Sequence, residues 1–521
     1  MRRIVIGILT ALLVAECGEA RELYVNPSAG NDSADGLSAT AAGGHGPVKT
    51  IAQAVRLAGP GDTVCLGGFT FKGNKEYIGI YGPKSGEPGK PITVDGQGAV
   101  IDGSVPLDPK DWQEVAPGLY RNLTIFQNTL HKSEDWVDCF CFVFEGRLNR
   151  MGHSQKAPRS PYKKPSELQP GEWTYQKEDE HTFYIKIDPQ KTLAGCKIEV
   201  PVINSGVQID GTVSHIMFKN ITVTHVINDG FALTVGRKPG SNEVRGRLGQ
   251  GNAMAGQNAG AGTAPPRKVR DIAYENIKAI AVCDDAFSAH SDCEVRVDGL
   301  LCDDCSTGIA SSGTSINTNV VMRNIHGMDI ILGGGNHVVR NSRIFAHGAS
   351  GAIILANIWY KDVPGLETCS LKLENVVMTG TKGEPGIPNL IQVSNAKASL
   401  DIDRCTVAGM KIAARNGGGL KITRSILAGA ARRAGAALQG CSIDIQADSR
   451  YEADGNIYDL EFIRVGNKPY SAKDFDAYKT ATGQDATSQW MTADLNALLG
   501  GVPRFQIGSQ PVGADMSVIP R

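Results

Sequence analysis

The stretch that decides the fold is HIMFKNITV (215–223), because close copies of it recur along the chain. The copies are DIAYENIKA (271–279), NVVMRNIHG (319–327) and SLKLENVVM (370–378). Looser copies read VRVDGLLC, VVRNSRIF, LDIDRCTV and LKITRSIL. Apolar and polar residues alternate within each copy, which is typical of a strand with one buried face. The sequence therefore predicts a repeat built from short strands.

The spacing of the copies favours a stacked architecture. The copies commonly follow one another after roughly 17 to 29 residues, with longer spacings where loops intrude, which suits a coil of three short strands. A single coil cannot bury its own apolar side chains, whereas coils stacked about 4.8 Å apart share one core and pair in parallel ladders. We therefore predict an all-β chain that forms a single-stranded right-handed parallel β-helix. One asparagine in each copy is expected in a ladder at a turn of the coil: Asn220, Asn276, Asn324 and Asn375.

The segments outside the repeat predict how the stack is completed. In PVKTIAQAVRLAGPGDTVCL (47–66), apolar residues recur at helical spacing before Gly-Pro-Gly, which indicates a helical cap on the first coil. The phrase LQPGEWTYQKEDEHTFYIKI (168–187) indicates a hairpin within an inserted segment. The expected divisions are a signal peptide (1–20), a cap with the first coils (21–109), a β-rich insertion (110–200), the main coils (201–460) and a C-terminal cap or wrapping segment (461–521).

Composition and the N-terminus limit the function classes. Met1-Arg2-Arg3 precedes an apolar run (4–15), with Gly18 and Ala20 at the small positions that a signal peptidase prefers. We expect a secreted, periplasmic or cell-surface protein of a bacterium, without a membrane span, since that run is shorter than the roughly 20 residues a span needs. The 53 basic and 54 acidic residues give a net charge of -1, which argues against a nucleic-acid partner.

The N-terminal motifs resemble a known superfamily. LYVNPSAGNDSADGL (23–37), the segment 47–66 and GKPITVDGQGAVIDG (89–103) are similar to the first turns of pectate-lyase-like β-helix proteins. GEWTYQ (171–176) and TATGQDATS (480–488) resemble bacterial members that include glycoside hydrolases and polysaccharide lyases. The resemblance implies the fold and an exported protein that acts on carbohydrate. It implies no particular catalytic residue, because the fold hosts several mechanisms.

Alignment of three successive coils indicates where the chemistry lies. HVINDGFALTVG (225–236), AVCDDAFSAHSD (281–292) and DDCSTGIASSGT (303–314) align with Phe231 beside Phe287 and Ile309. This register places the pair Asn228-Asp229 over Asp284-Asp285, and it places His290 in an outward column. Carboxylates in adjacent coils would lie roughly 5 Å apart, the separation expected of a retaining glycosidase. We predict that Asp229, Asp284 and Asp285 supply the acid and the base or nucleophile, and that His290 orients a carboxylate or binds a sugar hydroxyl.

Two loops supply candidate substrate-binding residues. The segment 237–268 is rich in Gly and Ala and carries Arg237 and Arg245, whose guanidinium groups suit an anionic sugar. Trp359 and Tyr360 precede Pro364-Gly365, and an exposed aromatic ring there would stack on a sugar. Arg323 completes this set. The expected partner is therefore a polysaccharide or oligosaccharide, neutral or anionic.

Alternatives to hydrolysis remain at this point. A polysaccharide lyase would use the same carboxylates to hold Ca²⁺ and would need a base, for which the candidates are His290, Arg237, Lys238, Arg323 and His347. A non-catalytic glycan-binding β-helix protein would need neither. The hydrolase requires no cofactor and no metal. Cys302 and Cys305 have the spacing of half a zinc site, but Cys283 and Cys293 do not complete it. We expect the four cysteines to be buried small side chains or to form one disulfide between neighbouring turns.

Overall fold

The structure is a computed structural model of the chain. It describes residues 19–73, 76–122, 140–149, 163–176, 179, 182–234, 269–290, 292–346, 351–356, 358–359, 363–380, 389–429, 440–494 and 505–520.

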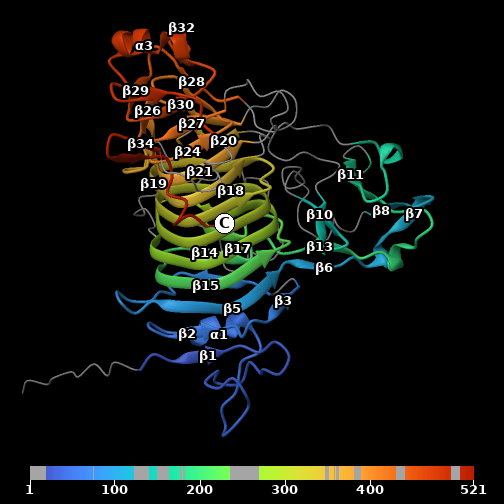
Figure 1. The fold of residues 1–521 in the computed structure, drawn as a ribbon. Coiled ribbons are helices and arrows are strands. Elements are labelled where there is room, and N and C mark those ends of the chain that lie inside the picture. The colour runs from blue at the N-terminus through green and yellow to red at the C-terminus, as the bar shows by residue number, and fades with distance from the viewer. Residues whose placement is uncertain are drawn as a thin grey trace, which may run out of the picture.

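A 25-stranded sheet forms the body of the molecule, and Figure 1 shows its strands lying one above another along the chain. Most of its strands pair in parallel with strands of neighbouring coils; β15, for example, pairs with both β5 and β17, whereas β32 pairs antiparallel with β31 at the C-terminal end. The all-β prediction and the parallel pairing are confirmed. The 25 strands are β1 Glu22–Tyr24, β2 Thr63–Cys65, β3 Thr70–Lys72, β4 Ile78–Tyr81, β5 Ile92–Asp102, β14 Val207–Asp210, β15 Ser214–Thr224, β16 Phe231–Thr234, β17 Val269–Ala289, β18 Cys293–Arg323, β19 Met328–Ala346, β20 Gly351–Leu355, β21 Cys369–Gly380, β22 Leu390–Val393, β23 Ala398–Asp403, β24 Thr406–Ala408, β25 Lys411–Ala414, β26 Gly419–Thr423, β27 Ile426–Ala428, β28 Ser442–Ile445, β29 Arg450–Asp454, β30 Ile457–Asp459, β31 Ile463–Val465, β32 Lys468–Tyr470 and β33 Gln489–Trp490.

The core of this stack is continuous. Alternate residues of the strands are buried, as in the first half of β5, and their side chains form one apolar cluster that runs from Leu23 to Tyr478. Helix α1 (Ile51–Leu57) lies at the N-terminal end, where Thr50 caps it by accepting from the Gln53 amide at 3.2 Å. Cys283, Cys293, Cys302 and Cys305 are all buried, as expected.

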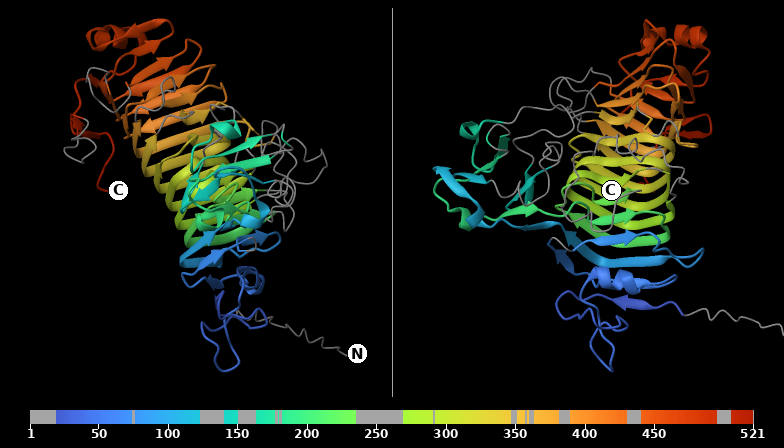
Figure 2. Two further views of the ribbon diagram at one scale, coloured as in Figure 1. Left: turned by 90° about the vertical axis from the view of Figure 1, so that its right-hand side faces the viewer. Right: turned by 180° about the vertical axis from the view of Figure 1, so that it is seen from behind.

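Residues between β5 and β14 leave the stack and form two small antiparallel sheets beside it (Figures 1 and 2). Trp173 in β11 pairs with Ile185 in β12, as expected of the predicted hairpin. Trp173, Phe142 and Phe183 pack in an apolar cluster that is separate from the core of the stack. The strands are β6 Ser104–Pro106, β9 Phe142–Phe144, β10 Arg147–Asn149 and β13 Ile198–Pro201 in one sheet, and β7 Gln113–Ala116, β8 Leu119–Asn122, β11 Trp173–Gln176 and β12 Thr182–Lys186 in the other.

Asparagine side chains form ladders at one corner of the coils, as predicted, but one of the four predicted residues does not take part. Asn276 donates to the side chain of Asn220 at 2.8 Å, and Asn375 donates to that of Asn341, also at 2.8 Å. The prediction for Asn324 was wrong. Asn324 donates instead to Asp303 at 2.7 Å at the next corner, five residues further along the coil, and Asn319 occupies the ladder position.

The C-terminal region continues past the last coils and then returns. Helix α3 (Phe475–Thr482) lies at the far end of the stack, and β34 (Phe505–Ile507) and β35 (Gln510–Val512) form a hairpin on its side. The Gly513 amide donates to the Arg424 carbonyl at 2.8 Å. Among the residues that the structure describes, no helix is long and apolar enough to cross a bilayer.

Candidate active site

The register expected for the three candidate coils is confirmed. Phe231 pairs with Phe287, and Phe287 pairs with Ile309, all three with their side chains in the core. Because these buried residues fix the strands, the residues immediately before them meet at one corner of adjacent coils.

Asp229, Asp284 and Asp285 meet at that corner and are named the carboxylate trio. The Asp284 amide donates to the Asn228 carbonyl at 3.1 Å, and the Gly230 amide donates to the Asp285 carbonyl at 2.8 Å. One carboxylate oxygen from each of the three lies within 4.8 Å of the others. The three residues are only 3 %, 8 % and 5 % exposed.

Local sequence explains why the corner can hold three acids. A Cβ atom at Gly230 would lie 2.7 Å from the Ala286 carbonyl oxygen, so only glycine lets the two coils approach here. On the next coil, Thr307 pairs with Asp285 and contributes a hydroxyl group in place of another acid. Asn228 donates from Nδ2 to Asp229 Oδ2 at 2.9 Å and so favours the ionised form of that carboxylate.

The closeness of the trio has a chemical consequence. Carboxylates at this separation in a buried site repel one another, so they cannot all ionise at low free-energy cost. Crowding of this kind favours a state in which the carboxylates share a proton or a bound cation.

His290 does not join the trio. It directly follows β17, whose last residues run from Asp285 to Ala289, and five extended residues at about 3.3 Å each place it roughly 16 Å from Asp285. Its ring instead faces the indole of Trp359, with centroids 5.2 Å apart and an interplanar angle of 39°. A role in orienting the trio is therefore incompatible with its position, and a role in binding a sugar hydroxyl remains a proposal.

The other predicted binding residues are distributed differently. Arg323 forms an ion pair with Asp303 at 2.8 Å, at a different corner from the trio, because Asp303 pairs with Ile280, five residues before Asp285. Arg237, Arg245 and Tyr360 lie outside the described residues.

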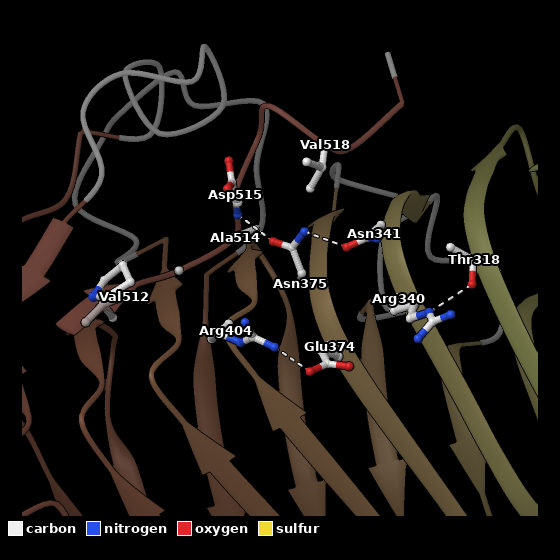
Figure 3. Close-up of a pocket in the computed structure, with 12 residues that line it drawn as sticks. Thr318, Arg340, Asn341, Glu374, Asn375, Arg404, Val512, Ala514, Asp515 and Val518 are labelled. Carbon is white, nitrogen blue, oxygen red and sulfur yellow. Dashed lines mark hydrogen bonds and ion pairs between the residues drawn. The ribbon is translucent and has the colours of Figure 1, made fainter.

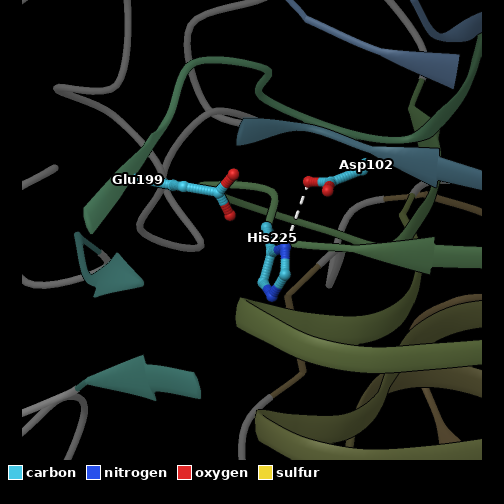
Figure 4. A group of neighbouring side chains, drawn as sticks. All are labelled: Asp102, Glu199 and His225. Carbon is cyan, nitrogen blue, oxygen red and sulfur yellow. Dashed lines mark hydrogen bonds and ion pairs between the residues drawn. The ribbon is translucent and has the colours of Figure 1, made fainter. Parts of the chain in front are cut away.

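A second cluster, which sequence analysis missed, joins the stack to the antiparallel sheets (Figure 4). Asp102 at the end of β5, Glu199 in β13 and His225 after β15 each place one ligand atom within 4.8 Å of the others. His225 Nδ1 contacts Asp102 Oδ1 at 3.0 Å. Lys72 Nζ lies 2.6 Å from Glu199 and 3.0 Å from Asp102. No spacing in the sequence links these residues, because they are brought together from three distant segments.

The electrostatics of the second cluster are those of an ion-pair network. Burial alone would raise the pKa of Asp102, but hydrogen bonds from His225 and Ser104 and the nearby Lys72 lower it overall. Burial likewise opposes the charge of Lys72, yet the two carboxylates raise its pKa. The lysine ammonium therefore already supplies the cation that these acids need, and the cluster fits a metal ion poorly.

A cavity among the described residues lies elsewhere, over the asparagine corner (Figure 3). It has a volume of about 400 Å³ and is roofed by the C-terminal segment, whose Asp515 amide donates to Asn375. Inside it, Arg404 pairs with Glu374, and Arg340 donates to Thr318 at 3.0 Å. Arg404 and Glu374 therefore largely neutralise one another, and the cavity lacks the crowded carboxylates of the trio.

Comparison with known proteins adds three solved structures. No protein-family model and no curated protein matches the sequence. A structure named only as a glycoside hydrolase is 12% identical, with a TM-score of 0.45 over 84% of this chain and 96% of its own. A structure of XylC with xylose is 13% identical, with a TM-score of 0.48 over 94% and 81%. A lacto-N-biosidase of family GH136 from Eubacterium ramulus is 10% identical, with a TM-score of 0.32 over 84% and 68%. The function is therefore argued from the residues of this chain.

Proposed function

We propose that this chain is an exported glycoside hydrolase that cleaves a polysaccharide or oligosaccharide at the carboxylate trio. The observation that carries the proposal is the meeting of Asp229, Asp284 and Asp285, with oxygens within 4.8 Å, at one buried corner. Glycosidases need two carboxyl groups in different protonation states, and crowding of the trio supplies that difference.

The roles follow from the contacts of each acid. Asp229 accepts from Asn228, which favours its charged form, so we assign it as the base or nucleophile. The protonated partner is then Asp284 or Asp285, which donates to the departing sugar oxygen. A carboxyl separation near 5 Å, as expected for adjacent coils, is that of a retaining mechanism.

The stack itself is consistent with this function. We infer that its parallel ladders close into a right-handed β-helix of the pectate-lyase-like kind, and that the N-terminal segment directs export. The continuous interior cluster of apolar side chains supports closure, because an open sheet would expose one of its faces.

A polysaccharide lyase is the second candidate. Three carboxylate oxygens this close suit Ca²⁺, which takes oxygen ligands, and the ion would bridge a uronate to the protein. The described base candidates fit less well: His290 lies far along the strand, and Arg323 is paired with Asp303. Lys238, His347 and Arg237 lie outside the described residues. Hydrolysis is therefore the preferred function.

The deciding experiment compares products. Protein beginning at Arg21 is incubated with neutral and anionic polysaccharides, with Ca²⁺ or with EDTA, while reducing ends and the ultraviolet absorbance of unsaturated uronates are followed. Hydrolysis predicts new reducing ends without absorbance and without an effect of EDTA. Rising absorbance that EDTA abolishes would establish the lyase instead.

The site assignment is tested by substitution. We expect Asp229→Asn and Asp285→Asn each to lower kcat by at least about 100-fold, because each removes an acid–base or nucleophilic group. Asp271→Asn is the matched control, since Asp271 is a half-exposed corner aspartate that contacts His215 at 2.8 Å. Full turnover by both trio variants would remove the assignment, and unchanged melting temperatures would exclude misfolding as the cause of a loss.

A further inference from the structure

Trp359 occupies a different environment from the other described tryptophans. Trp112 and Trp173 pack inside the antiparallel sheets, and Trp490 packs against the core of the stack. Trp359 instead follows β20 on the outer side of the coils and is half-buried.

The position of the indole depends on Gly333. A Cβ atom added at Gly333 would lie 1.8 Å from Cδ2 of the indole, so the ring rests directly on the glycine backbone. The Trp359 amide also donates to the Gly333 carbonyl at 2.6 Å. Any larger residue at position 333 would displace the ring.

The surroundings of the indole combine apolar and polar groups. The His290 ring lies beside it, at 5.2 Å between centroids. Ile331, Ile354 and Gln392 pair in register on successive coils with partly exposed side chains. Pyranose rings present C–H faces that pack on an indole, while their hydroxyl groups pair with imidazole and amide groups.

The carboxylate trio lies on the same wall of the stack as this surface. Asp285 pairs with Thr307, and three residues further along the coils one register column consists of Ser288, Ala310, Ile331 and Ile354. Ser288 and Ala310 are buried beside the trio, whereas Ile331 and Ile354, on the following coils towards Trp359, are partly exposed. A ligand chain that runs from the trio to Trp359 would therefore follow this wall.

We propose that Trp359, with His290 and the floor provided by Gly333, forms a sugar-stacking subsite for a linear oligosaccharide whose cleaved bond lies at the trio. The proposal rests on the proposed function and deepens it, because it specifies a chain-like substrate. A separation of roughly 16 Å between Asp285 and His290 exceeds one sugar ring. The preferred substrate is therefore a polymer or a long oligosaccharide, and small glycosides bind without this subsite.

Binding is measured by affinity electrophoresis in gels that contain soluble neutral or anionic polysaccharides, with Asp285→Asn as the parent to slow turnover. We expect Trp359→Ala and Gly333→Ala each to weaken binding about 5- to 10-fold. Gly46→Ala is the control, since a Cβ atom there would meet no atom nearer than 3.6 Å. Binding by Trp359→Ala equal to that of the parent, or a parent that no polysaccharide retards, would overturn the proposal.

Kinetics separate this proposal from the assignment of the trio. In the otherwise unaltered chain, Trp359→Ala should raise KM about 5- to 10-fold for long substrates and leave kcat and short substrates unchanged. Weaker binding by Trp359→Ala together with full turnover by Asp285→Asn would keep the subsite and reject the trio. Loss of turnover in Asp285→Asn with normal long-chain KM in Trp359→Ala would do the reverse.

Discussion

His337 is a buried histidine whose contacts suit the neutral ring. Nε2 donates to the Gly334 carbonyl at 2.9 Å, and Nδ1 accepts from the Ser315 hydroxyl at 2.8 Å. The residue is 2 % exposed, and burial lowers its pKa from 6.5 to about 4. The unfolded chain therefore binds a proton at His337 at a higher pH than the folded chain does.

This difference predicts a pH dependence of stability. Above about pH 6.5 His337 is neutral in both the folded and the unfolded state, and its full contribution to the free energy of unfolding is present. As the pH falls towards 4, His337 gains a proton in the unfolded state only, so the free energy of unfolding falls by up to roughly 3 kcal/mol. His337→Gln should show a smaller loss over the same range in urea unfolding. His326→Gln is the control, because His326 is exposed and pairs with Asp304. Equal pH slopes for the wild type and His337→Gln would contradict the prediction.

The carboxylate trio shows how far sequence reasoning reaches at the scale of single residues. Asp229, Asp284 and Asp285 could be placed together because phenylalanines two residues later on both strands fix the register. The sequence could not show that His290 lies apart from the trio. Alignment of the coils predicts which residues are neighbours on adjacent coils, but it does not give the distance between two residues along one strand.

At the scale of elements, the asparagine corner depends on an unusual backbone conformation. Asn276 has φ 47° and Asn220 has φ 57°, values in the left-handed region that asparagine tolerates better than most residues. The hydrogen bond between their side chains then links two coils.

Asn276→Ala should destabilise the protein by about 2 kcal/mol, since alanine is strained at this φ and the hydrogen bond is lost. Asn276→Gly loses the same hydrogen bond without the strain and should be less damaging, by about 1 kcal/mol. Urea unfolding measures both. Equal destabilisation by the two variants would show that strain at this corner is unimportant.

The misplacement of Asn324 has a physical reason at the same scale. Several coils have two left-handed corners five residues apart, such as Asn276 and Ala281. The copy NVVMRNIHG carries an asparagine at both corners, Asn319 and Asn324, with φ 56° and 53°. The sequence pattern alone predicts either asparagine equally well as the member of the ladder. Only the pairing between coils distinguishes them.

At the scale of the whole molecule, Lys72 connects two separately packed bodies. It bridges Asp102 of the stack and Glu199 of the antiparallel sheets, whose side chains are 11 % and 9 % exposed. This contact could not be predicted, because the three residues share no repeat and are separated by up to 127 positions in sequence.

Lys72→Met should destabilise the protein by about 2 kcal/mol at neutral pH, because it leaves two buried carboxylates without their cation. The loss is smaller than for a fully buried pair, because solvent reaches Lys72 and screens the interaction. Glu199→Gln in the same chain should restore part of the loss, as measured by a double-mutant cycle in urea. Lys421→Met, at an exposed pair with Glu452, should change stability by less than about 0.5 kcal/mol. Additive effects of the Lys72 and Glu199 substitutions would show that the two bodies are not coupled there.

The returning C-terminal segment has a consequence for the order of events during synthesis. Its amides bind Arg424, Thr406 and Asn375, which belong to coils made about a hundred residues earlier. Coils can add one upon another as the chain emerges, because each needs only its neighbour. The face of the coils that residues 505–520 cover therefore stays exposed to solvent until those residues have been translated. This face is the last part of the stack to be covered during synthesis.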